Sequence, residues 1–198
     1  MSSRVALRPR CDRCYLPSHL CLCAEIPRVQ TRTRFLLVQH ALEIRKKSNT
    51  GRVAALALTN ATLLTHGSPA DVLDSSLFAE PGTWLLFPDG PELPEDTPPP
   101  RQVVVLDGSW SQARRMSQRL PTLRLLPRLV LPPPPPGMLH LREPSHPAGM
   151  STLDAIARAV ELLEGPQTAA PLVRLAQLRV QRIAECGSLN REAMGQNR

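Results

Sequence analysis

Four cysteines near the amino terminus have the side chains and the spacing of a metal site. Cys11, Cys14, Cys21 and Cys23 all fall within the stretch RCDRCYLPSHLCLC, residues 10–23. A Cys-x2-Cys pair and a Cys-x-Cys pair can converge on one tetrahedral Zn²⁺ through their thiolates. In a reducing compartment, closely spaced cysteines indicate a metal before they indicate disulfides. The second pair is tighter than the usual zinc-finger spacing, so four reduced, partly buried thiols are the alternative.

A zinc ion with four cysteine ligands has no open position, so we expect a structural role for it. The cysteine segment, residues 10–23, is too short to hold a core of its own, and the metal would therefore supply folding energy. Tyr15, Leu16 and Leu20 are expected to pack around it. Arg10 and Arg13 would then be presented rigidly, which suits contacts with phosphate groups.

A carboxylate at the end of a predicted strand is the second candidate for chemistry. The stretch VVVLDGSWSQARRM, residues 103–116, runs from a β-branched segment through Asp107 into a helical pattern. In a parallel α/β sheet, ligands bind in the crevice at the carboxyl ends of the strands. Gly108 lets another group approach the backbone closely, and the following helix offers free N–H groups. The alternative is that Asp107 merely caps this helix while Trp110 fills its first turn.

The charge balance indicates an anionic partner. The chain has 24 basic and 17 acidic side chains, a net charge of +7, and only two of the basic residues are lysines. Arginine matches phosphate geometry and a basic chain attracts polyanions, so nucleic acid is the first partner to consider. An ordinary solvated surface is the alternative. Six aromatic residues in the whole chain argue against a broad base-stacking surface.

No apolar run approaches the roughly 20 residues of a membrane span. The amino terminus has too short an apolar stretch for a signal peptide. We therefore expect a cytoplasmic protein that does not contact membrane.

Strand and helix patterns alternate along the chain and must position these side chains. Strands are predicted at residues 33–40, 61–67, 83–88 and 102–107, with an extended edge segment at 123–132 that contains Pro127. Helices are predicted within residues 48–61, 70–78, 111–120, 151–165 and 170–186; the expected N-caps are Ser48, Asn49 or Thr50 for the first, Ser109 or Ser111 for the third and Ser151 for the fourth. Gly165 is expected to stop the fourth helix.

This alternation predicts an α/β fold, with a mostly parallel sheet covered by helices on both faces. We divide the chain into a zinc-binding lobe at residues 1–30, an α/β domain at 31–187 and a flexible tail at 188–198. The strand at 83–88 ends on a Pro-Asp-Gly turn, which should lie beside the turn that follows Asp107. A proline-rich stretch at 131–149 is long enough to be functional.

Four sequence elements, in order and spanning nearly the whole chain, resemble the DTW-domain family of bacterial tRNA-uridine aminocarboxypropyltransferases. They are the cysteine segment at 10–23, SNTGR at 48–52, DGSW at 107–110, and LRE at 141–143 with STLDAIA at 151–157. Relatives often carry threonine where this chain has Ser109, which keeps the hydroxyl. They often carry an aromatic residue near Leu139, and the chain lacks one there.

The resemblance implies a SPOUT-like fold, with the carboxyl-terminal part tucked into a knot. It also implies S-adenosylmethionine as donor, tRNA as partner and no obligate protein partner. The reaction would move the 3-amino-3-carboxypropyl group onto N3 of a uridine and release methylthioadenosine. Two other classes stay open: a SPOUT-type RNA methyltransferase with the same donor, and a non-catalytic zinc and RNA-binding module.

The residues then take expected roles. Asp107 is the candidate base for the N3 proton or the partner of the donor's sulfonium, with Ser109 and Trp110 beside it. The donor pocket is expected to comprise Pro88, Asp89, Gly90, Asp107, Gly108, Arg142, Glu143, Ser151, Thr152 and Leu153. The RNA contacts are expected from Arg13, Arg45, Lys46, Lys47, Asn49, Thr50, Arg52, Arg114 and Arg115. His40 and Glu43 are expected at a strand end near the site.

Overall fold

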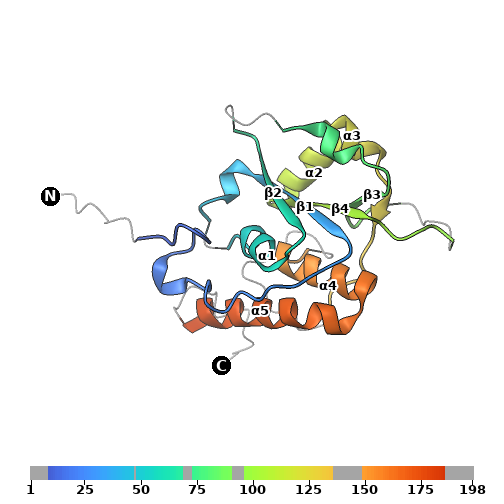
Figure 1. Cartoon of the computed structure of the whole chain (residues 1–198). Helices are drawn as coiled ribbons and strands as arrows, with labels where there is room; N and C mark the ends of the chain where they lie inside the picture. The colour runs from blue at the N-terminus through green and yellow to red at the C-terminus, as the bar shows by residue number, and fades with distance from the viewer. Residues whose placement is uncertain (1–8, 47, 69–72, 91–95, 136–148, 186–198) are drawn as a thin grey trace, which may run out of the picture.

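A computed structural model gives the fold, and it describes residues 9–46, 48–68, 73–90, 96–135 and 149–185. Its centre is a five-stranded sheet in which every pairing is parallel, with the strand order β2-β1-β4-β3-β5 (Figure 1). The strands are β1 (Arg34–His40), β2 (Ala61–His66), β3 (Thr83–Leu86), β4 (Gln102–Asp107) and β5 (Arg128–Leu129). The predicted α/β class and parallel sheet are confirmed.

The two central strands are apolar on both faces, as strands of a parallel sheet covered by helices must be. Phe35 to Val38 of β1 are fully buried, and so are Val103 and Val104 of β4. The two-residue strand β5 forms an edge of the sheet. Pro127 precedes it, and its carbonyl accepts a hydrogen bond from the Leu85 N–H. Proline is tolerated there because its missing N–H faces away from the ladder.

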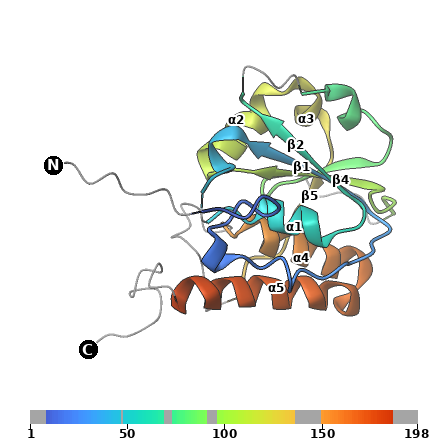
Figure 2. The ribbon, with the colours of Figure 1, turned by 60° about the vertical axis from the view of Figure 1, so that its left-hand side comes forward.

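Helices cover both faces of the sheet (Figures 1 and 2). One face packs against α1 (Gly51–Ala57), α4 (Thr152–Glu164) and α5 (Pro166–Glu185). The other face packs against α2 (Trp110–Arg119), α3 (Pro121–Leu125) and a 3-10 helix at Ser75–Phe78. Alternate residues of β1 therefore enter two separate apolar clusters, Phe35 and Leu37 on the first face and Leu36 and Val38 on the second.

Three predicted elements differ from the structure. Residues 123–125 were expected to be extended, but they belong to α3, because Pro121 at the first helical position has the backbone angle that starts a helix. Helix α5 begins at Pro166 and not near residue 170, so it follows α4 after the single residue Gly165, whose φ is +93°. Within the predicted helix at 70–78, the structure has only the 3-10 helix Ser75–Phe78, and residues 70–72 lie outside the described chain.

The chain leaves two neighbouring strands toward opposite faces. After β1 it runs into α1 on one face, and after β4 it runs into α2 on the other. Adjacent parallel strands with this arrangement form a topological switch point, where a crevice opens outside their carboxyl ends. The fold therefore singles out the ends of β1 and β4 as the place to examine for a ligand site.

The cysteine segment is continuous with the main core. Cys14, Leu16 and Leu20 are at most 3% exposed and belong to the same apolar cluster as the sheet and α4. Across the ranges that the structure describes, none of the helices has the length and apolar character needed to cross a bilayer.

Candidate functional site

Asp107, the last residue of β4, lies at the switch point and is almost completely buried, with 3% of its surface exposed. One carboxylate oxygen, Oδ2, accepts hydrogen bonds from Gln39 Nε2 at 2.8 Å and from Asn49 Nδ2 at 2.6 Å. The other oxygen, Oδ1, accepts one from the Thr152 hydroxyl at 2.6 Å. We refer to Gln39, Asn49, Asp107 and Thr152 as the Asp107 cluster.

Four separate elements bring the Asp107 cluster together. Gln39 is the register partner of Asp107 in β1, so the two side chains lie on the same face of the sheet. Asn49 belongs to the loop before α1, and Thr152 is the first residue of α4. Gly51 begins α1 directly against the carboxylate, and a Cβ atom at that position would overlap the Asp107 side chain. The glycine of the SNTGR element is thus explained by a close approach to Asp107.

Asp107 does not cap the helix that follows it. Ser109 is the N-cap of α2, because its Oγ accepts the Gln112 N–H at 3.4 Å while Gln112 Oε1 accepts the Ser109 N–H at 2.7 Å. This capping box satisfies the free N–H groups at the helix start without the carboxylate. The alternative interpretation of Asp107 as a helix cap is therefore wrong.

The two turns predicted to meet do lie together. Trp110 stacks on Phe87 just after β3, with ring centroids 5.4 Å apart and an interplanar angle of 17°. Pro88, Asp89 and Gly90 follow this ring, and Gly90 fits so closely against the Arg128 side chain that a Cβ atom would overlap it. Arg142 and Glu143, also expected in the donor pocket, lie outside the described residues.

The start of α4 also lies at the site, next to the Asp107 carboxylate. Ser151 is its N-cap and accepts the Asp154 N–H at 3.2 Å, as predicted. The Leu153 N–H donates to the Thr50 hydroxyl at 3.1 Å. Hydrogen bonds therefore join the loop before α1 to the start of α4 both directly and through the Asp107 carboxylate.

The cysteine thiols have the geometry of a tetrahedral zinc site. The four Sγ atoms lie within 4.8 Å of one another, with Cys11 and Cys23 3.6 Å apart and Cys14 and Cys21 3.9 Å apart. A Zn–S bond of about 2.3 Å places the sulfurs of a tetrahedron about 3.8 Å apart. The predicted ligand set therefore fits zinc.

The surroundings of the thiols also suit a metal. Backbone N–H groups of Cys14 and Arg13 point at the Cys11 sulfur and lower the pKa of Cys11 to about 6. Burial raises the pKa of Cys14 and of Cys23, because a buried thiolate without a cation is costly. A bound Zn²⁺ supplies that cation, so the burial favours the metal-bound form.

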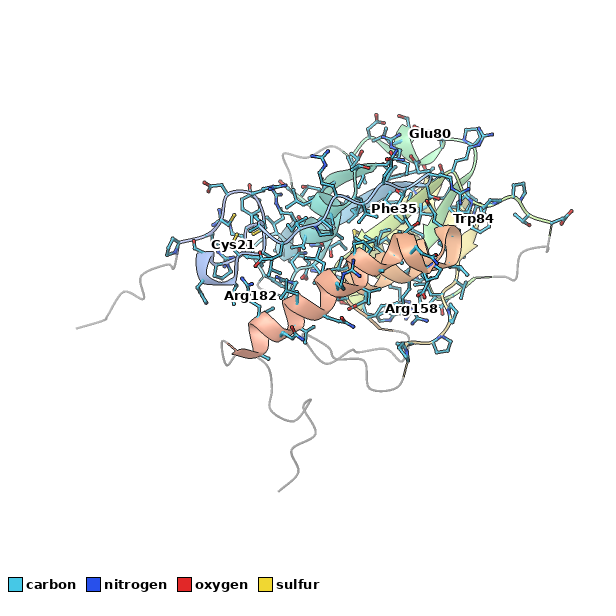
Figure 3. The ribbon with its side chains drawn as sticks, turned by 60° about the horizontal axis from the view of Figure 1, so that its bottom comes forward. Cys21, Phe35, Glu80, Trp84, Arg158 and Arg182 are labelled. Atoms are coloured by element: carbon cyan, nitrogen blue, oxygen red, sulfur yellow. The ribbon has the colours of Figure 1, made fainter. Side chains whose placement is uncertain are left out.

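Two arginines bond the cysteine segment to the α/β domain, and a third bonds the loop before α1. Arg182 of α5 donates from Nη1 to the Cys21 carbonyl at 3.0 Å and from Nη2 to Glu25 at 2.7 Å (Figure 3). Arg52 of α1 donates to the Arg13 carbonyl at 2.8 Å. Arg179 of α5 is 1% exposed and donates to the Asn49 carbonyl at 2.8 Å, and burial lowers its pKa to about 10.

The residues predicted to bind RNA separate into two groups. Arg13, Arg45, Arg114 and Arg115 are exposed. Asn49 and Thr50 are buried with their side chains engaged inside the protein, and Arg52 is half-buried between α1 and the cysteine segment. Lys46 pairs with the buried Glu43 at 2.6 Å, and Lys47 lies outside the described chain.

Sequence reasoning missed Gln39 and Arg179. Gln39 is the polar residue that directly follows the apolar run of β1, at a buried position, which was a signal for a buried hydrogen bond. Arg179 sits in an amphipathic helix with many arginines, so its sequence context did not distinguish it from a surface residue. His40, expected near the site, lies beside Gln39 and accepts the Leu42 N–H at 3.2 Å through Nδ1.

Comparison with known proteins gives a family. Among curated proteins, tRNA-uridine aminocarboxypropyltransferase A of Arabidopsis thaliana is 30% identical over 135 residues, 55% of this chain and 50% of the relative. The tRNA-uridine aminocarboxypropyltransferase 2 proteins of Mus musculus and Drosophila melanogaster are 28% and 25% identical, over 79% and 84% of this chain and 57% and 72% of the relatives. Two of these three matches thus span little more than half of the relative. No solved structure matches the chain.

Residues 8–184 match the sequence profile described as the DTW domain, and the chain therefore belongs to the DTW domain family.

Proposed function

We propose that this protein transfers the 3-amino-3-carboxypropyl group of S-adenosylmethionine to N3 of a uridine in tRNA. The DTW match over residues 8–184 is the observation that carries the proposal. Two further observations support it. The relatives are named for this activity, and a buried, hydrogen-bonded carboxylate lies at the switch point of the parallel sheet.

The reaction needs one bond to form and one to break. The bond between the donor's sulfur and the terminal carbon of its carboxypropyl arm breaks, and its electron pair stays on sulfur in methylthioadenosine. The lone pair of uracil N3 forms the new carbon–nitrogen bond, and the N3 proton leaves. The protein must therefore hold the carboxypropyl carbon, and not the methyl carbon, in line with N3.

Asp107 is proposed to act mainly through its charge. Its carboxylate accepts three hydrogen bonds, from Gln39, Asn49 and Thr152, out of about four that a carboxylate can accept, so at most one lone pair, on Oδ1, is left to take the N3 proton. An electrostatic interaction with the donor's sulfonium requires no free lone pair. The three donors fix the negative charge in place before the substrate binds, which is the condition for electrostatic catalysis. A role as base is the alternative for the same residue.

The donor is proposed to bind between the turns beside Asp107. Pro88 to Gly90, Gly108 to Trp110 and Ser151 to Leu153 would line that pocket from β3, α2 and α4, and Arg142 and Glu143 would complete it. Ser109 and Trp110 would keep the turn in shape through the capping box and the Phe87 stack. The SPOUT-like, knotted topology belongs to this proposal too, and the parallel sheet with its site at the carboxyl edge supports it.

The RNA side of the site is proposed to use exposed arginines. Arg13 and Arg45 lie in the segments next to α1, and Arg114 and Arg115 lie on α2. Since Asn49 and Thr50 are bonded inside the protein, we assign them to shaping the site and leave phosphate contacts to the arginines. Lys47 stays in the proposed set. Zinc held by the four cysteines would fix the backbone around Arg13. The hydrogen bond from Arg52 to the Arg13 carbonyl would hold the same residue in position.

The decisive experiment uses donor labelled separately in the methyl and in the carboxypropyl carbons. Purified protein is incubated with unmodified tRNA, and the nucleosides are analysed by mass spectrometry. The proposal expects the carboxypropyl label on uridine and methylthioadenosine as by-product. Methyl label on the RNA would instead show a methyltransferase. Binding of tRNA with no consumption of donor would show a non-catalytic RNA-binding module.

A further inference from the structure

Tyr15 has a backbone conformation that a tyrosine rarely adopts. Its φ is +57°, and within the described ranges every other residue with positive φ is a glycine. Its N–H donates to the Cys11 carbonyl at 2.8 Å, so the residue closes the turn that carries Cys11 and Cys14. A side chain in this left-handed region is strained, and glycine is the residue that fits it without cost. The turn alone therefore does not explain why a tyrosine occupies this position.

Burial in the core does not supply that reason. Tyr15 is 37% exposed, whereas its neighbours Cys14 and Leu16 are 3% and 2% exposed. Of the three residues expected to pack around the metal site, Leu16 and Leu20 are buried in the core and Tyr15 is partly exposed. All six aromatic residues of the chain lie in described segments, and among them only Tyr15 is exposed, while the other five are buried or partly buried.

Arginines from two directions fix the tyrosine. The Arg52 guanidinium lies over the ring, 3.9 Å from its centroid. Arg10 donates from Nη1 to the Tyr15 carbonyl at 2.8 Å. Arg52 is itself held by the Arg13 carbonyl. The ring is therefore immobilised before any ligand arrives, and a partner that stacks on it loses little side-chain entropy.

The ring is also linked to the candidate site through its contact with Arg52. Arg52, which covers it, directly follows Gly51, and Gly51 packs against the Asp107 carboxylate. The exposed Arg13 stands two residues before the tyrosine, so the surroundings are basic. An exposed aromatic ring paired with a guanidinium is the kind of surface on which proteins stack the unpaired bases of RNA.

We propose that Tyr15, held by Arg52, is a stacking platform for an unpaired base of the tRNA substrate beside the target uridine. The inference rests on the proposed function for the identity of the RNA. A single platform agrees with the scarcity of aromatic residues, because one fixed base is enough to set the register of a loop over the site. The strain at Tyr15 is then retained for binding and not for folding.

The test compares three variants of the full-length, zinc-loaded protein. Tyr15→Gly removes the ring and the strained conformation, Tyr15→Phe keeps a ring, and Leu125→Ala alters a residue on α3 that is 86% exposed. Affinity for a fluorescent tRNA that the wild-type protein modifies is measured over a series of salt concentrations. Zinc content and Tm are measured on the same samples.

Loss of one stacked base should weaken binding by about 5- to 150-fold. For Tyr15→Gly we expect that loss with an unchanged salt slope, because no phosphate contact is removed. Zinc content and Tm should stay near the wild-type values, since glycine fits the turn. Tyr15→Phe and Leu125→Ala should bind like the wild-type protein.

Wild-type affinity in Tyr15→Gly would overturn the platform while leaving the proposed function intact. A wild-type protein that binds no tRNA would instead refute the proposed function. If Tyr15→Gly loses zinc or fails to fold, photo-cross-linking decides the question in the wild-type protein with tRNA that carries 4-thiouridine. The platform predicts a cross-linked peptide that contains Tyr15, and cross-links found only in other peptides would refute it.

Discussion

The cysteine segment and the Asp107 cluster are the two polar centres of the molecule, and they are assembled in opposite ways. The four thiols come from one stretch of chain, residues 10–23. The partners of Asp107 come from positions 39, 49 and 152. A site built from one segment leaves its spacing in the sequence, whereas a site built across a sheet leaves only isolated polar residues in apolar elements. The difference shows which kind of site a sequence can reveal.

The two centres also depend on different supports. Buried thiolates are costly without a cation, so we expect the cysteine segment to depend on a bound metal. The Asp107 cluster is held by the sheet, by α1 and by α4. We therefore expect removal of the metal to loosen the structure locally, and removal of the Asp107 charge to stop the chemistry while the fold persists. Substitutions in each centre test that contrast.

The largest effect is expected from Asp107→Asn. The amide oxygen can still accept from Gln39 and Asn49, and the amide nitrogen can donate to the Thr152 hydroxyl, which turns to accept. The hydrogen bonds survive but the charge is lost. Transfer activity should fall by about 10²- to 10⁴-fold. Single-turnover assays would measure this loss, and Tm should shift by only a few degrees.

Asp107→Ala is the matched contrast. It leaves the buried amides of Gln39 and Asn49 without their acceptor, at about 1–3 kcal/mol for each unsatisfied group. This variant should lose both activity and stability. Near-wild-type activity in Asp107→Asn would show that the charge has no part in the reaction, and would leave Asp107 as a purely structural acceptor.

The sequence was sufficient for the features that depend on local order. The strand patterns, the Ser151 cap and the cluster of four cysteines follow from neighbours in the chain. The structure confirms them, and of the two expected caps of α2, Ser109 and Ser111, it has Ser109. The register that sets Gln39 opposite Asp107 depends on which strands pair, and no local pattern states this. Arg179 was equally hidden, because its burial follows from how α5 packs on the loop before α1, where Arg179 bonds the Asn49 carbonyl.

Loss of the metal is expected to have the second largest effect. Cys14→Ser combined with Cys21→Ser removes two ligands of the site, and metal analysis should find that about one equivalent of zinc has been lost. Leu16, Leu20 and Leu22 are at most 2% exposed beside these cysteines. Exposing even one of them costs about 1.5–3 kcal/mol. A chain of this size should then melt about 3–12 °C lower.

The location of this loss distinguishes the two centres. Hydrogen exchange should accelerate in residues 10–23, while β1 and β4 keep their protection. Equal acceleration in the central strands would contradict a locally supported cysteine segment. A wild-type protein purified without added zinc that contains no metal would refute the zinc site itself.

A third polar contact, partly buried and outside both centres, gives a smaller effect. The Glu164 carboxylate at the end of α4 accepts the backbone N–H groups of Arg32 and Thr33 at 3.0 and 2.9 Å, just before β1. Glu164→Gln keeps one acceptor oxygen and turns an amide group toward the other N–H. We expect a stability loss of about 1–3 kcal/mol in chemical denaturation. Transfer activity should be unchanged, and an activity loss larger than the loss of folded protein would link this contact to the site.

The smallest effect is a pH dependence at the edge of the Asp107 cluster. Burial lowers the pKa of His40 below its ordinary value of 6.5, and the nearby His66 lowers it further. Among the smaller contributions, Glu43 raises this pKa, and Arg115 and Lys46 lower it. The folded protein therefore favours the neutral ring, whose Nδ1 accepts the Leu42 N–H. A lowered folded-state pKa contributes stability that is fully present above pH 6.5 and is lost as the pH falls through the folded-state value.

His40→Asn tests this effect, because asparagine can accept the same N–H two residues on without titrating. Between pH 8 and pH 5, the Tm of the wild-type protein should fall more than that of the variant. The difference should be smaller than the effect of Glu164→Gln, since His40 is only partly buried. Proton NMR of the histidine rings would give the pKa directly. If the His40 ring titrates at or above 6.5, or if the two Tm profiles run parallel, the partly buried neutral ring of His40 contributes no pH-dependent stability, and this prediction is wrong.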